Sequence, residues 1–345
     1  MNKKYSELAE LFRSEKTDEE ILDFLLNYHK NDIADMMAGM TEEERKRLYH
    51  LLGAQKVAEI FKYIEEPRKY IRELSVESAA RVISEMDSDD AVDLLEDLDP
   101  EEKEQIVRML DEDAKKDVKM LLSYDEEEIG SCMTTNYICI PEDLTIKQAM
   151  SELVKQAGEN DNIMTIYVVD EKGVFAGAID LKDLIRAREN THLEDLVLKS
   201  YPYVTDHEKI DDCMDRILDY AEDSIPVLSE DKRILGVITS EDLIEMVDNE
   251  MGEDYAKLAG LTAEEDLKEP TLQSMKKRLP WLIILLFLGM AVSSVVGLFE
   301  NVVAVLPIVI CFQSLVLDMA GNVGTQSLAV TIRVLMDENL TGKQK

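Results

Sequence analysis

Apolar residues recur at helical spacing through the first 128 residues, in short units that begin with acidic residues. In one unit, Asp99 is placed to cap a helix, Pro100 takes its first position and an apolar run follows. Similar units begin at Thr41, Asp87 and Asp111. The acidic first turns complement the helix dipole. Repeated amphipathic helices of this kind predict an α-superhelical domain over residues 1–128.

The next segment, residues 129–250, contains an internal duplication. Residues 166–185 align without a gap on residues 225–244, and eight of the twenty aligned positions are identical. Alternating apolar positions on both sides of a charged turn are typical of paired strands. Each copy therefore reads as helix, strand, turn, strand, helix. We expect two α/β halves that pack face to face around a pseudo-twofold axis.

The hydropathy pattern changes again near residue 279. Residues 279–299 carry no charge, and about 20 such residues suffice for a helix to cross a bilayer. Residues 301–332 contain Asp318 as their only charge and are too many for one straight crossing. The pattern predicts two membrane spans, the second long, tilted or broken, with Pro307 and Gly321 as break points. A buried helix of a soluble protein is the alternative for the first span.

Charge is distributed unevenly between these parts. The chain has 38 basic and 73 acidic residues and a net charge of −35, of which residues 1–270 contribute −37 and the remainder +2. Such acidity excludes a general nucleic-acid binder, which needs cationic surface. The basic cluster at 276–278 predicts a multi-pass protein of the cell membrane whose N-terminal domains are cytoplasmic. The four cysteines form no CxxC pair, so neither a zinc site nor a disulfide framework is indicated.

The duplicated unit carries the same short motif twice. The pattern G-x-I-x-x-x-D occurs as Gly177, Ile179 and Asp183, and again as residues 236, 238 and 242. In this the segment resembles a CBS-domain pair. A CBS pair alone is common to many enzymes and channels.

The order of the modules is more specific. An acidic helical domain, a CBS pair and an apolar tail containing the segment GNVGTQS (residues 321–327) together resemble the MgtE family of magnesium transporters. The resemblance implies a homodimer in the lipid bilayer with five membrane helices per subunit and a pore at the dimer axis. Because the chain stops at Lys345 after two spans, we expect a fragment or a truncated product. The expected parts are 1–128 (helical domain), 129–250 (CBS pair), 251–278 (connecting or plug helix and linker) and 279–345 (partial transmembrane domain).

The resemblance points to clustered carboxylates as sensors of Mg²⁺, a hard cation that prefers oxygen ligands and keeps several waters. The spacing supports this independently. Asp89 and Asp93 are four residues apart, as are Glu250 and Asp254, and like charges at that spacing destabilise a helix unless something neutralises them. A solvated acidic face is the alternative for any single residue. The candidate ligands are Glu59, Asp89, Asp93, Asp211, Glu222, Asp223, Asp242, Glu245, Glu250, Glu253 and Asp254.

Asp242 has a rival role as a ligand of an adenine nucleotide. In CBS pairs the aspartate that ends the pattern G-x-[IV]-[TS]-x-x-D can bind the ribose, and here Thr239, Ser240 and Asp242 complete the pattern. The first copy has Asp180 in place of Thr239, so a phosphate would be repelled there. We therefore expect one site per chain, for ATP or another adenine nucleotide. The alternative role of Asp242 is a helix cap.

The sequence contains no catalytic constellation and no phosphate-binding GxxxxGK[ST], so we expect a passive transporter and not an enzyme. In the apolar tail, Asn322, Gln326 and Ser327 are candidate pore-lining residues. The main hypothesis is a homodimeric channel or transporter subunit for Mg²⁺, gated by intracellular Mg²⁺. The alternatives are a membrane-tethered sensor of adenine nucleotides and a helical-repeat docking scaffold.

Overall fold

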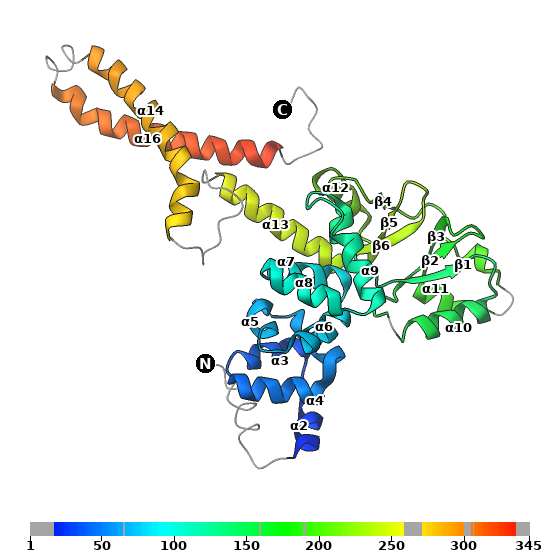
Figure 1. Cartoon of the computed structure of the whole chain (residues 1–345). Helices are drawn as coiled ribbons and strands as arrows, with labels where there is room; N and C mark the ends of the chain where they lie inside the picture. Colours follow the sequence, from blue (N-terminus) through cyan, green and yellow to red (C-terminus); the bar gives the residue numbers. More distant parts are fainter. Residues whose placement is uncertain are drawn as a thin grey trace. The chain divides into compact units, whose positions relative to one another are not determined.

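A computed structural model describes residues 17–64, 66–158, 160–188, 191–258, 271–299, 305 and 307–335 (Figure 1). The chain divides into two units, residues 1–243 and 244–345, each of which is described by itself. The first unit holds the helical domain and the two α/β repeats. The second holds the rest of helix α13 and the apolar helices.

The helical domain is a chain of short helices in which elements pack on the next but one along the sequence. Helix α4 contacts α6, α6 contacts α8, and α7 contacts α9. Their apolar faces form the core, so the predicted helical N-terminal domain is confirmed. The helices are α2 (Asp18–Leu25), α3 (Lys30–Met37), α4 (Glu42–Phe61), α5 (Pro67–Ile71), α6 (Val76–Ser84), α7 (Ser88–Glu96), α8 (Pro100–Met109) and α9 (Glu112–Leu121).

The hydrogen bonds that cap these helices match those predicted from the sequence only in part. Thr41 and Glu44 form a reciprocal capping box on α4, and Asp111 accepts a hydrogen bond of 2.8 Å from the backbone N–H of Ala114. Asp99 precedes α8 as predicted, but its side chain makes no cap bond. Its carboxylate instead pairs with Arg68 and Arg72. A tertiary ion pair has therefore replaced the expected local bond.

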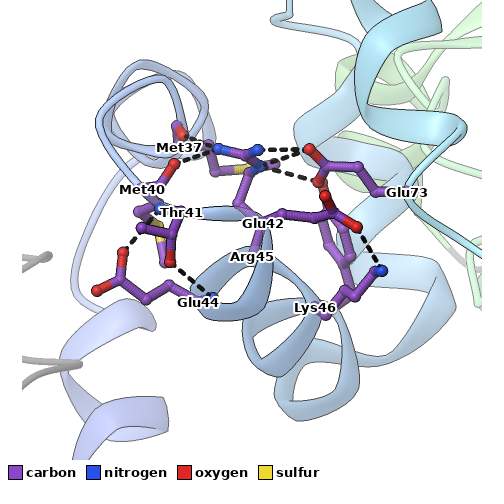
Figure 2. A network of polar contacts seen from close by, with 9 residues as sticks. Met37, Met40, Thr41, Glu42, Glu44, Arg45, Lys46 and Glu73 are labelled. Carbon is purple, nitrogen blue, oxygen red and sulfur yellow. Dashed lines mark hydrogen bonds and ion pairs between the residues drawn. The ribbon is translucent and has the colours of Figure 1, made fainter.

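A buried ion pair joins the start of α4 to the segment after α5 (Figure 2). The Arg45 guanidinium binds both carboxylate oxygens of Glu73 and donates to the carbonyl oxygens of Met37 and Met40. Both side chains are less than a tenth exposed. Burying two charges is tolerated because hydrogen bonds satisfy most of their polar atoms.

The two α/β repeats form separate three-stranded sheets with the same topology. The first has the order β1-β2-β3 and the second β4-β5-β6, each with one parallel and one antiparallel pair. The strands are β1 (Ile138–Pro141), β2 (Thr165–Val169), β3 (Phe175–Asp180), β4 (Val204–Thr205), β5 (Ser224–Leu228) and β6 (Ile234–Thr239). Their helices are α10 (Ile146–Gln156), α11 (Leu181–Arg186), α12 (Ile210–Tyr220) and α13 (Ser240–Leu258). The predicted order of helix, strand, strand and helix is therefore correct in both copies, but the sequence did not predict the first strand of each sheet, β1 and β4.

Each repeat packs against the segment that leads into the other. Thr134, before the first repeat, pairs with Val237 of β6, and Leu198, before the second, pairs with Ala178 of β3. A side chain at the neighbouring motif glycine would collide with the incoming backbone. A Cβ on Gly177 would lie 2.6 Å from a carbonyl oxygen, and one on Gly236 would lie 2.7 Å from another. The motif glycines are thus required by this reciprocal packing.

The second unit contains the apolar helices α14 (Thr271–Leu298) and α16 (Pro307–Leu335). Among the described residues, one helix, Met275–Leu298, is long and apolar enough to cross a membrane. The second predicted span does not meet that test within the described part of the chain. Helix α16 begins at Pro307 and continues through Gly321, so the prediction of a break at Gly321 was wrong. A single glycine removes no backbone hydrogen bond and is tolerated inside a long helix.

Candidate functional site

The helical domain and the second repeat meet at the N-terminus of α7. The backbone N–H of Thr135 donates to Ser88 Oγ at 2.9 Å, and its hydroxyl donates to Asp117 at 2.8 Å. Asn136 Nδ2 donates to Asp87 Oδ1, also at 2.8 Å. These bonds hold the segment before β1 against α7. Because the same segment pairs with β6, α7 is placed beside the end of β6 and the start of α13.

Carboxylates gather at this junction, and we call the set the acidic cluster. It comprises Asp87, Asp89 and Asp90, at and just after the start of α7, and Glu241 and Asp242, at the start of α13. Asp89 and Asp90 each feel the charge of Asp242. Residues about 150 positions apart in sequence are therefore close enough to repel one another across the interface.

Burial and repulsion from neighbouring carboxylates both favour protonation of Asp89, Asp90 and Asp242. Burial is the largest cause of the raised pKa of Asp89, and the charges of Asp242, Asp90 and Asp87 raise it further. Burial also raises the pKa of Asp90 to about 7, although Lys62 opposes the shift. The pKa of Asp242 is raised by burial against hydrogen bonds that lower it. The acidic cluster is thus a place where negative charge is costly and a cation would be stabilised.

Two atoms in the acidic cluster have contrasting surroundings. Asp242 Oδ2 accepts a hydrogen bond of 2.6 Å from the backbone N–H of Thr239, whose hydroxyl accepts from the backbone N–H of Asp242 in return. Asp242 is therefore a helix cap, as its alternative role predicted. Asp89 Oδ1, by contrast, is buried and has no hydrogen-bond partner among the described residues. A buried oxygen without a partner is costly and indicates a missing ligand or water.

One cation of the protein itself lies among these carboxylates. Lys62 follows the last turn of α4, and its Nζ lies 3.2 Å from Glu241, 3.6 Å from Asp87 and 3.9 Å from Asp90. Burial lowers the pKa of Lys62, but the carboxylates of Asp90, Asp87 and Glu241 outweigh it, so the pKa is raised. The ammonium is therefore charged at neutral pH. Within the described residues, no three acidic, histidine or cysteine side chains converge in the geometry of a metal site.

The structure distributes the other predicted ligands over several places. Asp93 lies one turn beyond Asp89 and adds to the charge felt by Asp90. Glu59 is outside the acidic cluster and pairs with Lys30 at 2.9 Å. Asp211 is exposed in the first turn of α12. Glu245 is exposed on α13, and the side chains of Glu250, Glu253 and Asp254 on the same helix lie outside the described residues.

Glu222 and Asp223 form a smaller acidic group after α12. The pKa of Glu222 is raised by burial and then by the charges of Asp180 and Asp223. Tyr201 donates to Glu222 at 3.5 Å. This group brings together the two repeats, because Asp180 ends β3 of the first.

The candidate nucleotide ligands and pore residues have local partners. Thr239 and Asp242 cap α13 together, and Ser240 donates its backbone N–H to the carbonyl of Asp223 at 3.0 Å. Asn322, Gln326 and Ser327 lie on α16, where the Thr325 hydroxyl donates to the Asn322 carbonyl.

The Cys132 thiol lies beside the acidic cluster, where burial, with the charges of Asp93, Asp242 and Asp89, raises its pKa to about 11. It is therefore an unreactive thiol at neutral pH.

Family models and known relatives match this architecture. A model described as the MgtE intracellular N domain matches residues 28–127, and the CBS domain model matches residues 127–190 and 193–249. The magnesium transporter MgtE of Enterococcus faecalis is 39% identical over 339 residues, which are 97% of this chain and 74% of that protein. The chain belongs to the MgtE family of magnesium transporters.

Further MgtE relatives extend the comparison. The MgtE proteins of Bacillus subtilis and Thermus thermophilus are 32% and 31% identical, and the chain spans about half the length of each, 49%. Among solved structures, the soluble part of a magnesium transporter has a TM-score of 0.68 at 29% identity and covers 72% of this chain and 98% of its own. The cytosolic domain of the Mg²⁺ channel MgtE in complex with ATP has a TM-score of 0.62 at 27% identity, covering 70% and 99%.

Sequence reasoning missed three members of the acidic cluster and its lysine. Asp87 and Asp90 belong to the run Asp-Ser-Asp-Asp, which the helix dipole explains equally well. Glu241 stands beside a predicted ligand in a chain rich in carboxylates. Lys62 carries no local signal, because its partners lie at least 25 residues away.

Proposed function

We propose that this MgtE-family chain senses cytosolic Mg²⁺ at the acidic cluster and couples it to a Mg²⁺ pathway in the membrane. The buried, unpartnered Asp89 Oδ1 carries the proposal. It faces the charge of Asp242 from the other side of the interface. A hydrated divalent cation there would neutralise both carboxylates and supply the missing partner.

The same geometry makes the docking of the helical domain depend on the ion. Without metal, repulsion among ionised carboxylates opposes contact between α7 and α13. With metal, the ion bridges carboxylates from both elements and favours contact. Because α13 begins in the second repeat and precedes the apolar helices in the sequence, we expect a change at its first turn to be passed on along the helix. Moving a gate from 1:99 to 99:1 needs about 5.5 kcal/mol, so several such sites must cooperate.

Calorimetry with MgCl₂ on the full chain in detergent tests the sensing site. The double variant Asp89→Asn/Asp242→Asn should lose one class of Mg²⁺ site and the Mg²⁺-dependent protection of the Thr135 amide from hydrogen exchange. Asp113→Asn, an exposed carboxylate in the first turn of α9, is the matched control and should behave as the parent. If the double variant binds Mg²⁺ and protects Thr135 as the parent does, the acidic cluster is not the sensor.

A regulatory role of an adenine nucleotide is a second part of the proposal. It is supported by the relative whose cytosolic domain was solved with ATP and by the motif that ends in Asp242. In this chain Asp242 faces other carboxylates, which would repel nucleotide phosphates. We therefore assign Asp242 to the cation first. Retained ATP affinity in Asp242→Ala would place the nucleotide away from Thr239, Ser240 and Asp242.

Assembly as a homodimer in the cell membrane completes the proposal. Val154 on α10 and Leu218 on α12 occupy equivalent positions of the duplication and are 68% and 43% exposed. Exposed apolar residues repeated by an internal symmetry are well suited to a second copy of the same chain. The helix Met275–Leu298 supports a membrane location, and the basic cluster at 276–278 supports cytoplasmic N-terminal domains.

A further inference from the structure

Lys62 occupies an unusual position for a lysine on a helical repeat. It lies at the C-terminus of α4, yet its side chain is only 28% exposed and its ammonium has three carboxylates within 4 Å. Asp87 and Asp90 belong to the helical domain, whereas Glu241 belongs to the start of α13. The shortest of the three contacts, 3.2 Å to Glu241, is thus the one that crosses the interface.

We propose that Lys62 is a built-in cation of the acidic cluster, which tethers the second repeat to the helical domain without metal and competes with Mg²⁺ for the same carboxylates. The proposal rests on the proposed sensing function for its second half only. The tether follows from the ion pairs themselves. The competition follows because a divalent ion bound by these oxygens would lie within a few ångströms of an ammonium.

The charges of the acidic cluster show why one lysine matters. Five carboxylates meet there, and Lys62 places one ammonium within 4 Å of three of them. A single positive charge offsets part of the repulsion and leaves the acidic cluster negative. The interface is therefore held weakly without metal and still attracts a divalent ion. Lys62 would then set the Mg²⁺ concentration at which the ion replaces its ammonium as the partner of these carboxylates.

Removing the charge should change two properties in opposite directions. Lys62→Gln should weaken metal-free docking, because repulsion is then unopposed. It should also tighten Mg²⁺ binding by about tenfold, because the like charge near the ion is gone. An ordinary structural ion pair would move only the first property, and a damaged fold would weaken both.

The test compares the full chain in detergent with three variants. Docking is measured in metal-free buffer as hydrogen exchange of the Thr135 amide, which donates to Ser88 across the interface. Affinity is measured by calorimetry with MgCl₂. Lys62→Arg keeps the charge and should retain both properties. Lys103→Gln is the matched control, since Lys103 has the same 28% exposure and pairs with Glu96 inside the helical domain.

Faster exchange of Thr135 together with tighter Mg²⁺ binding in Lys62→Gln supports the proposal. Unchanged exchange overturns the tether, and unchanged or weaker Mg²⁺ binding overturns the competition. If neither the parent nor Lys62→Gln binds Mg²⁺ at the acidic cluster, the sensing function fails and the competition falls with it. The metal-free exchange then still decides the tether on its own.

Discussion

The carboxyl of Asp90 makes the interface sensitive to pH at the scale of one residue. Its pKa is raised to about 7, chiefly by burial, so the folded protein binds a proton more readily than the unfolded chain. For an acid shifted upward, stability is lost as pH rises from the unfolded pKa near 4 toward 7. Asp90→Asn removes this titration.

The stability gained by Asp90→Asn should therefore be near zero at about pH 3 and grow with pH to at most roughly 4 kcal/mol at pH 8. Thermal unfolding of the variant and the parent in metal-free buffer measures the difference at each pH. Asp113→Asn should show no such growth. A pH-independent difference for Asp90→Asn would mean that the carboxyl is solvated in solution.

Ala221 offers a second test at the same scale. It ends α12 with φ 51° and ψ 38°, a left-handed conformation that glycine adopts with less strain. Ala221→Gly should therefore stabilise the second repeat by about 1 kcal/mol, measured by chemical denaturation. The same change at Ala157, which ends α10 with φ −64°, is the control and should destabilise. Equal effects at both positions would contradict the conformational explanation.

At the scale of the element, the sequence patterns predicted the helices and strands that local spacing specifies. The duplication placed all four strands of its aligned segments, because alternation and a shared turn specify each hairpin. Both hairpins carry a register shift at the equivalent point, Val168/Val169 in β2 and Val227/Leu228 in β5. It did not predict where capping carboxylates point. Asp99 binds arginines about 30 residues away, and Asp87 accepts a hydrogen bond from the Asn136 side chain. Partners this distant leave no periodic signal in a single sequence.

The Arg45–Glu73 pair gives the prediction for this scale. Arg45→Met would remove the buried partner of the Glu73 carboxylate, to which the Tyr49 hydroxyl donates a long hydrogen bond of 3.5 Å. Removing one partner of a buried pair costs about 3–5 kcal/mol. The unfolding transition of the helical domain should shift accordingly in thermal denaturation.

An exposed pair on the same helix is the control. Lys46 pairs with Glu42, and both side chains are at least half exposed. Lys46→Met should therefore cost less than about 1 kcal/mol. If the two variants unfold alike, the Arg45–Glu73 pair contributes no more than a surface contact. Arg45→Met/Glu73→Leu should recover part of the loss, because no buried charge is then left unpaired.

At the scale of the whole molecule, the sequence predicted the order of the modules, because each module has its own hydropathy and charge pattern. It did not predict the site that forms between the modules. Asp89 and Asp242 were named separately as candidate ligands from resemblance and spacing. That they repel one another across an interface depends on how α7 docks beside β6, which the hydrogen bond from Thr135 to Ser88 positions. The position of Lys62 in the acidic cluster could not be predicted for the same reason, because it also depends on how the modules pack.

Assembly of two copies is the remaining prediction at this scale. Val154 and Leu218 are exposed at equivalent positions of α10 and α12, and the internal symmetry presents them as a matched pair of apolar contacts. A lysine buried in such an interface loses its hydration without a partner. Val154→Lys/Leu218→Lys should therefore weaken self-association by roughly a hundredfold or more.

Sedimentation of residues 1–258 measures this association without the apolar helices, since a relative's soluble part was solved as a separate chain. Met109→Lys is the control, because Met109 is an apolar residue 47% exposed on α8 of the helical domain. The parent and the control should sediment as dimers at micromolar concentration, and the double variant as a monomer with unchanged circular dichroism. A double variant that stays dimeric would move the contact between copies away from α10 and α12.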